Sequence, residues 1–187
     1  MKEISLHILD IVQNSITAGA TQVNLLLDEV GGELTLVIED NGCGMSPELL
    51  ARVSDPFTTT RTTRKMGLGI PLLRMSAEMS GGSLTIESTE GKGTRLSTVF
   101  HTDHIDCPPL GDMASTLALT LQGAPDLDIL YSHRKDGREF QLDTRELRSQ
   151  LGPEISLAEP EITLWIQDYV QEQEEALTAP SQDTQGL

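Results

Sequence analysis

The order in which hydrophobic periodicity changes over the first hundred residues constrains the fold more than any other feature. Apolar side chains first recur at helical spacing and then alternate with polar ones, as they do in half-buried strands. The segments read as helix 3–18, strands 21–27 and 33–39, a short helix from Ser46, a helix at about 69–80, and strands 83–88 and 94–100. This order predicts an α/β (α+β) two-layer sandwich, with helices on one face of a mixed, mostly antiparallel sheet.

A smaller α/β segment follows an interruption by Pro and Gly at residues 101–112. It contains a helical pattern, a hairpin around the turn RKDGR, and a last helix that opens at Pro160. We therefore expect three parts: a main domain at 1–100, a small α/β extension of unknown role at 101–170, and a frayed or disordered acidic tail at 171–187.

Charge and cysteine content argue against several classes of function. The 187 residues include 29 acidic and 13 basic side chains, which gives a formal net charge of −16. Nucleic acid and anionic membranes both require basic patches, so neither is expected as a partner. Cys43 and Cys107 show no zinc-ligand spacing and no disulfide pattern. With no signal peptide and no apolar run long enough to span a membrane, we expect a cytoplasmic protein.

Asp10 and Asn14 are the first candidates for chemistry, because they stand four residues apart on the polar side of the first helix. An amide oxygen is a suitable ligand for Mg²⁺, and a carboxylate one turn away could orient or deprotonate a water or hydroxyl group that faces a phosphate. Taken alone, the pair is better explained as a solvated polar face.

A second group follows the strand at 33–39. Asp40 could accept a hydrogen bond from an adenine amino group, since a carboxylate is only an acceptor. Gly42 and Gly44 would let the backbone approach a flat base, and Met45 would pack on its ring. An ordinary Asp-Asn-Gly turn is an equally good explanation when the segment is considered alone.

A third group combines glycines at a helix start with a basic, hydroxyl-rich loop. Gly67, Leu68 and Gly69 would direct free backbone N–H groups toward an anion. The preceding loop at 58–65 concentrates hydroxyl and cationic side chains suited to phosphate, including Thr59, Thr60, Arg64 and Lys65. Further along, the Thr94 hydroxyl in a hairpin could bridge to the carboxylate at position 40 or to the base through water.

In this order the motifs resemble those of the Bergerat-fold (GHKL) ATPases, the superfamily of DNA gyrase, the ninety-kilodalton heat-shock chaperone, histidine kinases and MutL. The resemblance covers about residues 1–100 and is closest to the ATP-binding domain of histidine kinases in the segment DPFTTTR…GLGIPLL, whereas QNSITAGAT is more like MutL. It implies that Asn14 holds Mg²⁺, that Asp40 reads adenine, and that Gly67, Gly69 and the 58–65 loop cover the phosphates.

Two departures from the superfamily pattern affect the expected activity. The ATPases place Glu where this chain has Asp10, which puts hydrolysis in doubt. The first motif begins almost at Met1, which leaves no room before it for a helical hairpin with a phosphoacceptor histidine. The resemblance therefore implies a stand-alone ATP-binding domain and not a complete sensor kinase.

Two functions remain open on this basis. The first is Mg-dependent ATP binding by a soluble protein kinase or slow ATPase that acts on an unidentified partner protein, with Asp10 as the catalytic residue. The alternative is a non-catalytic, ATP-gated module that binds a regulated partner. A DNA-repair ATPase is disfavoured by the acidic charge and by the lack of the domain that follows the ATP domain in such proteins.

Overall fold

The computed structural model describes residues 3–54 and 69–180. Within these residues the chain forms six helices and six strands. Their order is α1 (Ile4–Thr17), β1 (Gln22–Val30), β2 (Glu33–Asp40), α2 (Pro47–Ser54), α3 (Gly69–Met79), β3 (Ser83–Thr89), β4 (Gly93–His101), α4 (Met113–Gly123), β5 (Asp128–Lys135), β6 (Arg138–Asp143), α5 (Thr144–Leu151) and α6 (Pro160–Thr178).

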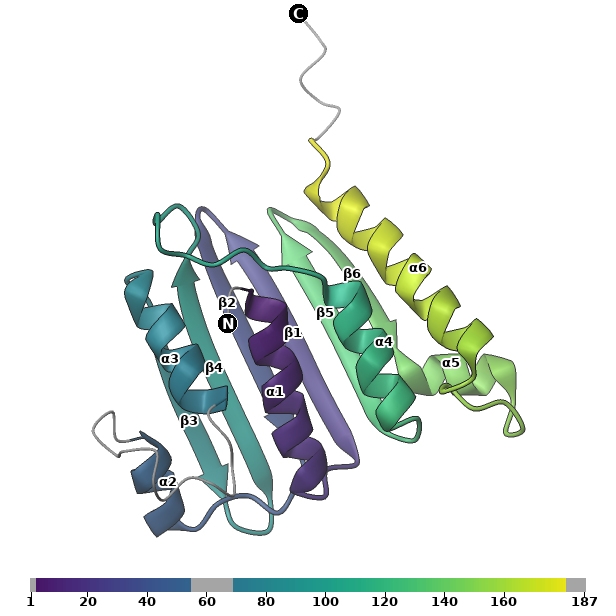
Figure 1. Ribbon diagram of the computed structural model, residues 1–187, viewed down its shortest axis with the longest axis horizontal. Coiled ribbons are helices and arrows are strands. Elements are labelled where there is room, and N and C mark those ends of the chain that lie inside the picture. The colour runs from purple at the N-terminus through teal and green to yellow at the C-terminus, as the bar shows by residue number, and fades with distance from the viewer. Residues whose placement is uncertain (1–2, 55–68, 181–187) are drawn as a thin grey trace, which may run out of the picture.

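All six strands belong to one sheet, in the order β3-β4-β2-β1-β5-β6. Every neighbouring pair is antiparallel except β1 and β5, which run parallel. Figure 1 shows α1, α3 and α4 side by side on one face of this sheet, with α6 over its β6 edge. The predicted two-layer sandwich with a mixed, mostly antiparallel sheet is therefore confirmed.

The segment after residue 112 adds to the same sheet and does not form a sheet of its own. Helix α4 connects β4 to β5, and β5 then pairs along β1 from Gln22↔Asp128 to Glu29↔Lys135. Because a crossover between parallel strands places its helix on a sheet face, α4 lies next to α1.

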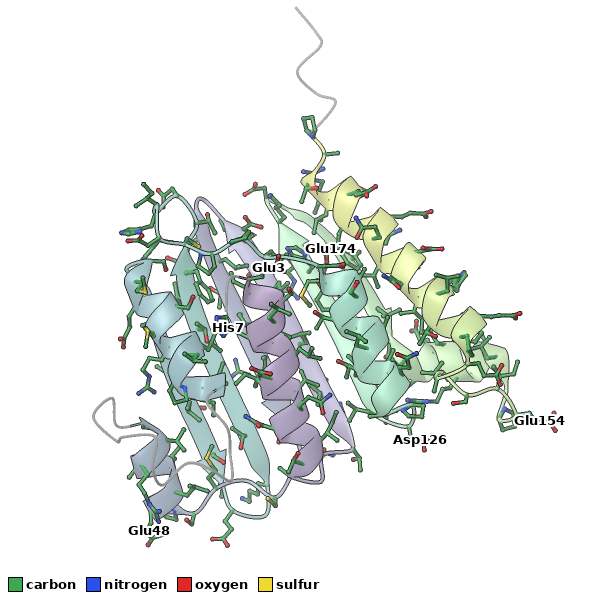
Figure 2. The ribbon with its side chains drawn as sticks, viewed as in Figure 1. Glu3, His7, Glu48, Asp126, Glu154 and Glu174 are labelled. Carbon is green, nitrogen blue, oxygen red and sulfur yellow. The ribbon has the colours of Figure 1, made fainter. Side chains whose placement is uncertain are left out.

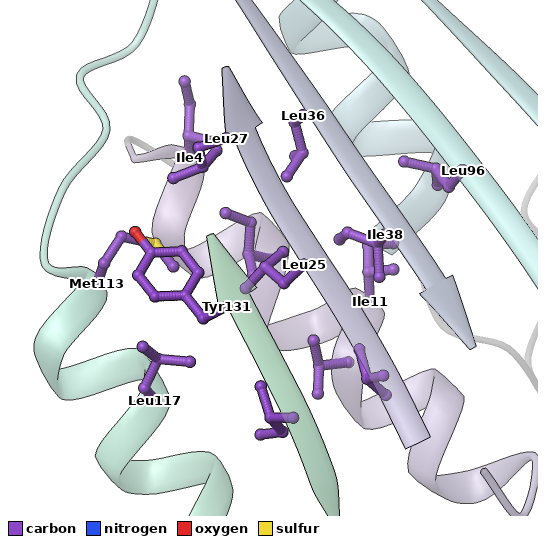
Figure 3. Close-up of a cluster of buried hydrophobic side chains, with 14 of the residues drawn as sticks. Ile4, Ile11, Leu25, Leu27, Leu36, Ile38, Leu96, Met113, Leu117 and Tyr131 are labelled. Atoms are coloured by element: carbon purple, nitrogen blue, oxygen red, sulfur yellow. The ribbon is translucent and has the colours of Figure 1, made fainter. Parts of the chain in front are cut away.

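One hydrophobic core joins both parts of the chain. Figure 3 shows Tyr131 of β5 and Met113 of α4 beside Ile4 of α1 and Leu25 of β1. Each of these four side chains is at most 2% exposed. Alternation along the strands points these residues toward the helices, so α1 and α4 pack on one continuous apolar surface.

The last helix is longer than the sequence indicated. Helix α6 opens with Pro160 at its first turn, as predicted, and continues to Thr178, whereas the expected tail began at residue 171. Val170 and Leu177 are both buried on its inner side, which explains why the helix continues through its acidic second half. Residues 181–187 lie outside the described part of the chain. Among the described helices, none has the length and hydropathy needed to cross a membrane.

Candidate functional site

A cavity of about 240 Å³ opens between the C-terminal half of α1 and the ends of β2 and β4. It is lined by Ile11, Asn14, Ser15, Thr17, Ala18, Ile38, Asp40, Cys43, Gly44, Met45, Leu49, Ile70, Thr94 and Leu96. Helix, strand and turn residues that are far apart in sequence thus meet around one space. Five of the predicted site residues are among them: Asn14, Asp40, Gly44, Met45 and Thr94.

Asp40, the last residue of β2, is held in place by two hydrogen bonds. The Ser15 hydroxyl on α1 donates to Oδ2 at 2.6 Å, and the Gly42 amide donates to Oδ1 at 2.9 Å. Each oxygen keeps a further lone pair, since a carboxylate can accept about four hydrogen bonds. The arrangement presents an oriented acceptor to the cavity.

The turn after Asp40 is anchored on both sides. The Asn41 side chain accepts from the amides of Thr21 and Gln22, and the Cys43 amide donates to the carbonyl of Ala18. These bonds fix the turn against the end of α1 and the start of β1. Gly42 is buried in this turn, where a Cβ would lie 3.0 Å from the Cβ of Ala18.

Gly44 is required by both its backbone conformation and its surroundings. Its φ is +67°, a region that favours glycine, and a Cβ there would overlap the carbonyl oxygen of Thr89. Next to it, the amide of Met45 donates to the Ser88 hydroxyl at 2.8 Å, and the Met45 side chain is 5% exposed. The turn is thereby packed against the β3–β4 hairpin.

Thr94 lies opposite Asp40 in the β2–β4 register. Its hydroxyl shares a hydrogen bond of 2.8 Å with the hydroxyl of Ser88. We expected Thr94 to reach Asp40 or a base through water. In the structure its direct partner is Ser88, while Thr94 itself still lines the cavity.

Asp10 and Asn14 lie on the side of α1 that faces α3. A Cβ built on Gly69, the first residue of α3, would lie 3.3 Å from the Cβ of Asp10 and 3.7 Å from Nδ2 of Asn14. That Nδ2 is buried and has no hydrogen-bond partner within residues 3–54 and 69–180. Asp10 is exposed and is not among the residues that line the cavity. The two residues therefore differ in environment although they are one turn apart.

The predicted phosphate region lies only partly within the described residues. Thr59, Thr60, Arg64, Lys65, Gly67 and Leu68 lie outside the described residues, whereas Gly69 and Ile70 form the first turn of α3. Gly69 is buried against α1, and the next residue, Ile70, lines the cavity. Among the described residues, no group of three or more His, Cys, Asp or Glu side chains could hold a metal ion.

Two polar residues of this region were missed in the sequence. Ser15 and Ser88 position Asp40, Met45 and Thr94 through their hydroxyls. Ser15 had a detectable signal, because it stands four residues after Ile11 on the buried side of α1, where a polar side chain needs a partner. Ser88 shares the inner side of β3 with Leu84 and Ile86, which is a weaker signal of the same kind.

His7 is a further polar residue on α1, and it points toward α3 (Figure 2). It is 1% exposed, and in the part of the chain that the structure describes neither ring nitrogen has a hydrogen-bond partner. Burial lowers the pKa of His7, which favours a neutral imidazole. His7 does not line the cavity.

Comparison with known proteins identifies relatives of the N-terminal part. The family described as "Histidine kinase-, DNA gyrase B-, and HSP90-like ATPase" matches residues 2–104. A sensor protein of Shewanella frigidimarina is 33% identical over 97 residues, which are 50% of this chain and 15% of that protein. The histidine protein kinase DivJ of Caulobacter vibrioides is 35% identical over 96 residues, 48% of this chain and 16% of that protein.

The chain therefore spans only a small part of the length of these curated relatives. Among solved structures, the catalytic domain of the histidine kinase ThkA aligns with a TM-score of 0.39 and 22% identity, over 52% of this chain and 64% of that one.

Proposed function

Because this chain belongs to the histidine kinase-, DNA gyrase B- and HSP90-like ATPase family, we propose that its cavity between α1, β2 and β4 binds ATP together with Mg²⁺. The observation that carries the proposal is that Asp40 on β2 and Asn14 on α1 line the same cavity. The carboxylate of Asp40 is already oriented as an acceptor, and the buried Nδ2 of Asn14 is a donor with no partner among the described residues. An amino group of the base and a phosphate oxygen of a bound nucleotide would satisfy these two groups.

Asp40 is suited to bind the adenine base of ATP. With one lone pair on each oxygen occupied by Ser15 and Gly42, the carboxylate still accepts a hydrogen bond from an exocyclic amino group. Guanine carries a carbonyl oxygen at the corresponding position, and two acceptors would face each other there. The apolar side chains of Met45 and Leu96 line the same cavity and provide a surface for the ring.

Asn14 and the start of α3 are suited to bind the phosphates of ATP. The amide oxygen of Asn14 would hold Mg²⁺ together with phosphate oxygens. Bound Mg²⁺ neutralises phosphate charge, which matters in a chain with a net charge of −16. The N–H groups in the first turn of α3, which begins at Gly69, would favour an anion, and from the sequence we assign the same role to Thr59, Thr60, Arg64, Lys65, Gly67 and Leu68.

We propose that the bound ATP serves a protein kinase or slow ATPase reaction on a partner protein. Asp10 would then accept the proton of the attacking hydroxyl or water as the γ-phosphate is transferred and ADP leaves. The second candidate is an ATP-gated binding module without chemistry. It is favoured by one observation, namely that Asp10 is exposed and does not line the cavity.

Titration of ATP with and without Mg²⁺ tests the nucleotide site. We expect Asp40→Ala to weaken ATP binding by about 100-fold or more, because a hydrogen-bonded ionised partner is lost. Asn14→Ala should remove mainly the part of the affinity that depends on Mg²⁺. The matched controls Asp28→Ala on β1 and Gln13→Ala on α1, at positions that do not line the cavity, should bind as wild type. Equal affinity in all five proteins would contradict the site.

Release and transfer of labelled γ-phosphate separate the two candidate reactions. If the chain is a kinase or ATPase, Asp10→Asn should abolish phosphate release and transfer and leave ATP affinity unchanged. If wild-type protein binds ATP without releasing or transferring phosphate, the gated module is the better description.

A further inference from the structure

Helices α4 and α6 leave a groove between them, in the part of the chain that follows the family match at residues 2–104. Its volume is about 430 Å³, and its walls include Ser115, Leu119 and Gln122 on α4 and Thr163, Leu164 and Gln167 on α6. The Gln167 side chain donates to the Ser115 hydroxyl at 3.1 Å and ties the two walls together. Figure 1 shows the two helices on the same side of the sheet, with α6 at its edge.

Two leucines face each other across this groove. Leu119 is 54% exposed and Leu164 is 59% exposed. Single exposed leucines are common on protein surfaces and need no explanation. A pair on opposite walls of one preformed groove is different, because together they can enclose an apolar side chain of another molecule.

The charged side chains on the two helices that form the groove are all negative. Helix α4 carries no charged residue, and α6 carries five acidic residues and no Lys or Arg. Glu161 and Asp168 stand one turn before and one turn after Leu164, on the same side of the helix. Among the described residues neither of these carboxylates forms an ion pair.

We propose that this groove binds a basic amphipathic helix of a partner protein. Apolar side chains of that helix pack between Leu119 and Leu164, and its Lys or Arg side chains face Glu161 and Asp168. Charge selects this occupant over a second copy of the chain, because two copies of α6 would bring the same carboxylates together. The inference does not depend on the nucleotide site.

A pair of synthetic peptides tests the proposal directly. The probes are a labelled amphipathic helical peptide of Leu and Lys and the same peptide with Glu in place of each Lys, titrated with the full chain in the absence of nucleotide. We expect the Leu/Lys peptide to bind and the Leu/Glu peptide not to bind. Leu119→Gln and Leu164→Gln should each weaken binding about tenfold, as loss of a buried anchor does. Leu6→Gln, at a leucine 41% exposed on α1, is the matched control and should have no effect.

Reversing the charge of the two carboxylates provides a second test. The double variant Glu161→Lys/Asp168→Lys should lose affinity for the Leu/Lys peptide and gain affinity for the Leu/Glu peptide. All substituted side chains are exposed, so thermal unfolding should confirm intact folds. Three results would overturn the proposal: no binding of the Leu/Lys peptide, binding that neither leucine substitution weakens, or a wild-type dimer that Leu164→Gln dissociates. Unchanged ATP affinity in these variants keeps the result separate from the nucleotide site.

Discussion

Ser15 shows how one hydroxyl on an apolar helix face can orient a binding residue. Its side chain is 3% exposed, so its hydroxyl cannot rely on water for a partner. Its bond to Asp40 joins α1 to the end of β2 and restricts the rotation of the carboxylate. In the proposed nucleotide site, Ser15 is therefore a positioning residue that acts through Asp40.

We predict that Ser15→Ala weakens ATP binding by about tenfold to 100-fold, since a hydrogen bond to a charged group contributes about 1.5–3 kcal/mol. It should also reduce the preference for ATP over GTP, because the freed carboxylate can turn away from the base. Calorimetric titration with both nucleotides measures the two effects. Ser5→Ala is the matched control, since Ser5 is also buried on α1 but far from the cavity, and its nucleotide affinity should stay at the wild-type value.

Gly93 gives a prediction about folding at the same place. Its φ is +123°, and a Cβ would overlap the carbonyl oxygen of Asp40. Gly91, two residues earlier in the same turn, has a φ of +81° and open space around it. Gly93→Ala should therefore lower the free energy of unfolding by about 3 kcal/mol or more, and Gly91→Ala by about 1 kcal/mol, from backbone strain alone. Urea denaturation checks the difference, and equal losses would show that β2 and β4 do not approach as closely as described.

At the residue scale, local sequence signals indicated only part of what the cavity contains. The turn from Asp40 to Met45 was recognisable because glycines and a strand end define it within a few residues. The buried position of Ser15 indicated that its hydroxyl needs a partner, but it did not indicate which one. That partner, Asp40, lies 25 residues away, and only the packing of α1 on β2 brings the two together. The role of Asp10 beside Asn14 stays a prediction: both residues lie next to Gly69, and the exposed Asp10 side chain is outside the lining of this cavity.

At the scale of elements, α6 is attached to the sheet by a buried ionisable cluster. His133 on β5 is fully buried, its Nδ1 lies 2.8 Å from Glu174 on α6, and its Nε2 lies 3.9 Å from Glu29 on β1. The Tyr131 hydroxyl donates to the same Glu174, whose position beside the sheet is labelled in Figure 2. Lys135 pairs with Glu29 at 3.7 Å.

The two carboxylates determine the protonation state of His133. Burial by itself lowers the pKa of His133, but the hydrogen bond to Glu174 and the negative charges of Glu174 and Glu29 outweigh it, so the pKa is raised above 6.5. The His133 imidazole, 3.9 Å from Glu29, and the nearby Lys135 in turn lower the pKa of Glu29. A histidine with a raised pKa stabilises the fold at pH values below its unfolded pKa, and this contribution is lost as the pH rises through its folded pKa.

We therefore predict that the attachment of α6 weakens as the pH rises from about 6 through the raised pKa of His133. The urea midpoint of the wild type should fall over this range, and hydrogen exchange in α6 should speed up. His133→Gln should remove this pH dependence and lower stability by about 3 kcal/mol near pH 6, because two partly buried carboxylates lose a charged partner. His104→Gln, at an exposed histidine, should keep the wild-type slope. A wild-type slope in His133→Gln would contradict the role of the cluster.

At the scale of the whole molecule, the sequence indicated the elements better than their pairing. The helix at the start, both N-terminal hairpins and the β5–β6 hairpin follow from local periodicity and turn residues. The parallel pairing of β1 with β5 joins segments about a hundred residues apart, and no local pattern specifies such a contact. For this reason the local patterns predict only an extension at 101–170, whereas in the structure β5 and β6 of this segment complete one side of the sheet that contains the proposed nucleotide site.

The position of β1 leads to a prediction about truncation. A chain ending at residue 112 keeps the whole segment matched by the family, but it exposes the edge of β1 and the side of α1 that packs on α4. It loses Met113, Leu117, Leu121, Ile129 and Tyr131, each at most 2% exposed. At about 1.5–3 kcal/mol for each buried side chain, these five contribute as much as the whole stability of a typical domain, about 5–15 kcal/mol.

We therefore expect the chain ending at residue 112 to be insoluble or to unfold without a cooperative transition, and to bind no ATP. Its exposed strand edge should also promote association between chains, which light scattering would detect. A chain ending at residue 180 removes no described contact and should unfold at the same urea concentration as the full chain. If the shorter chain instead unfolds cooperatively at the wild-type midpoint and binds ATP, then residues 1–112 form an independent domain and β5 contributes little to its stability.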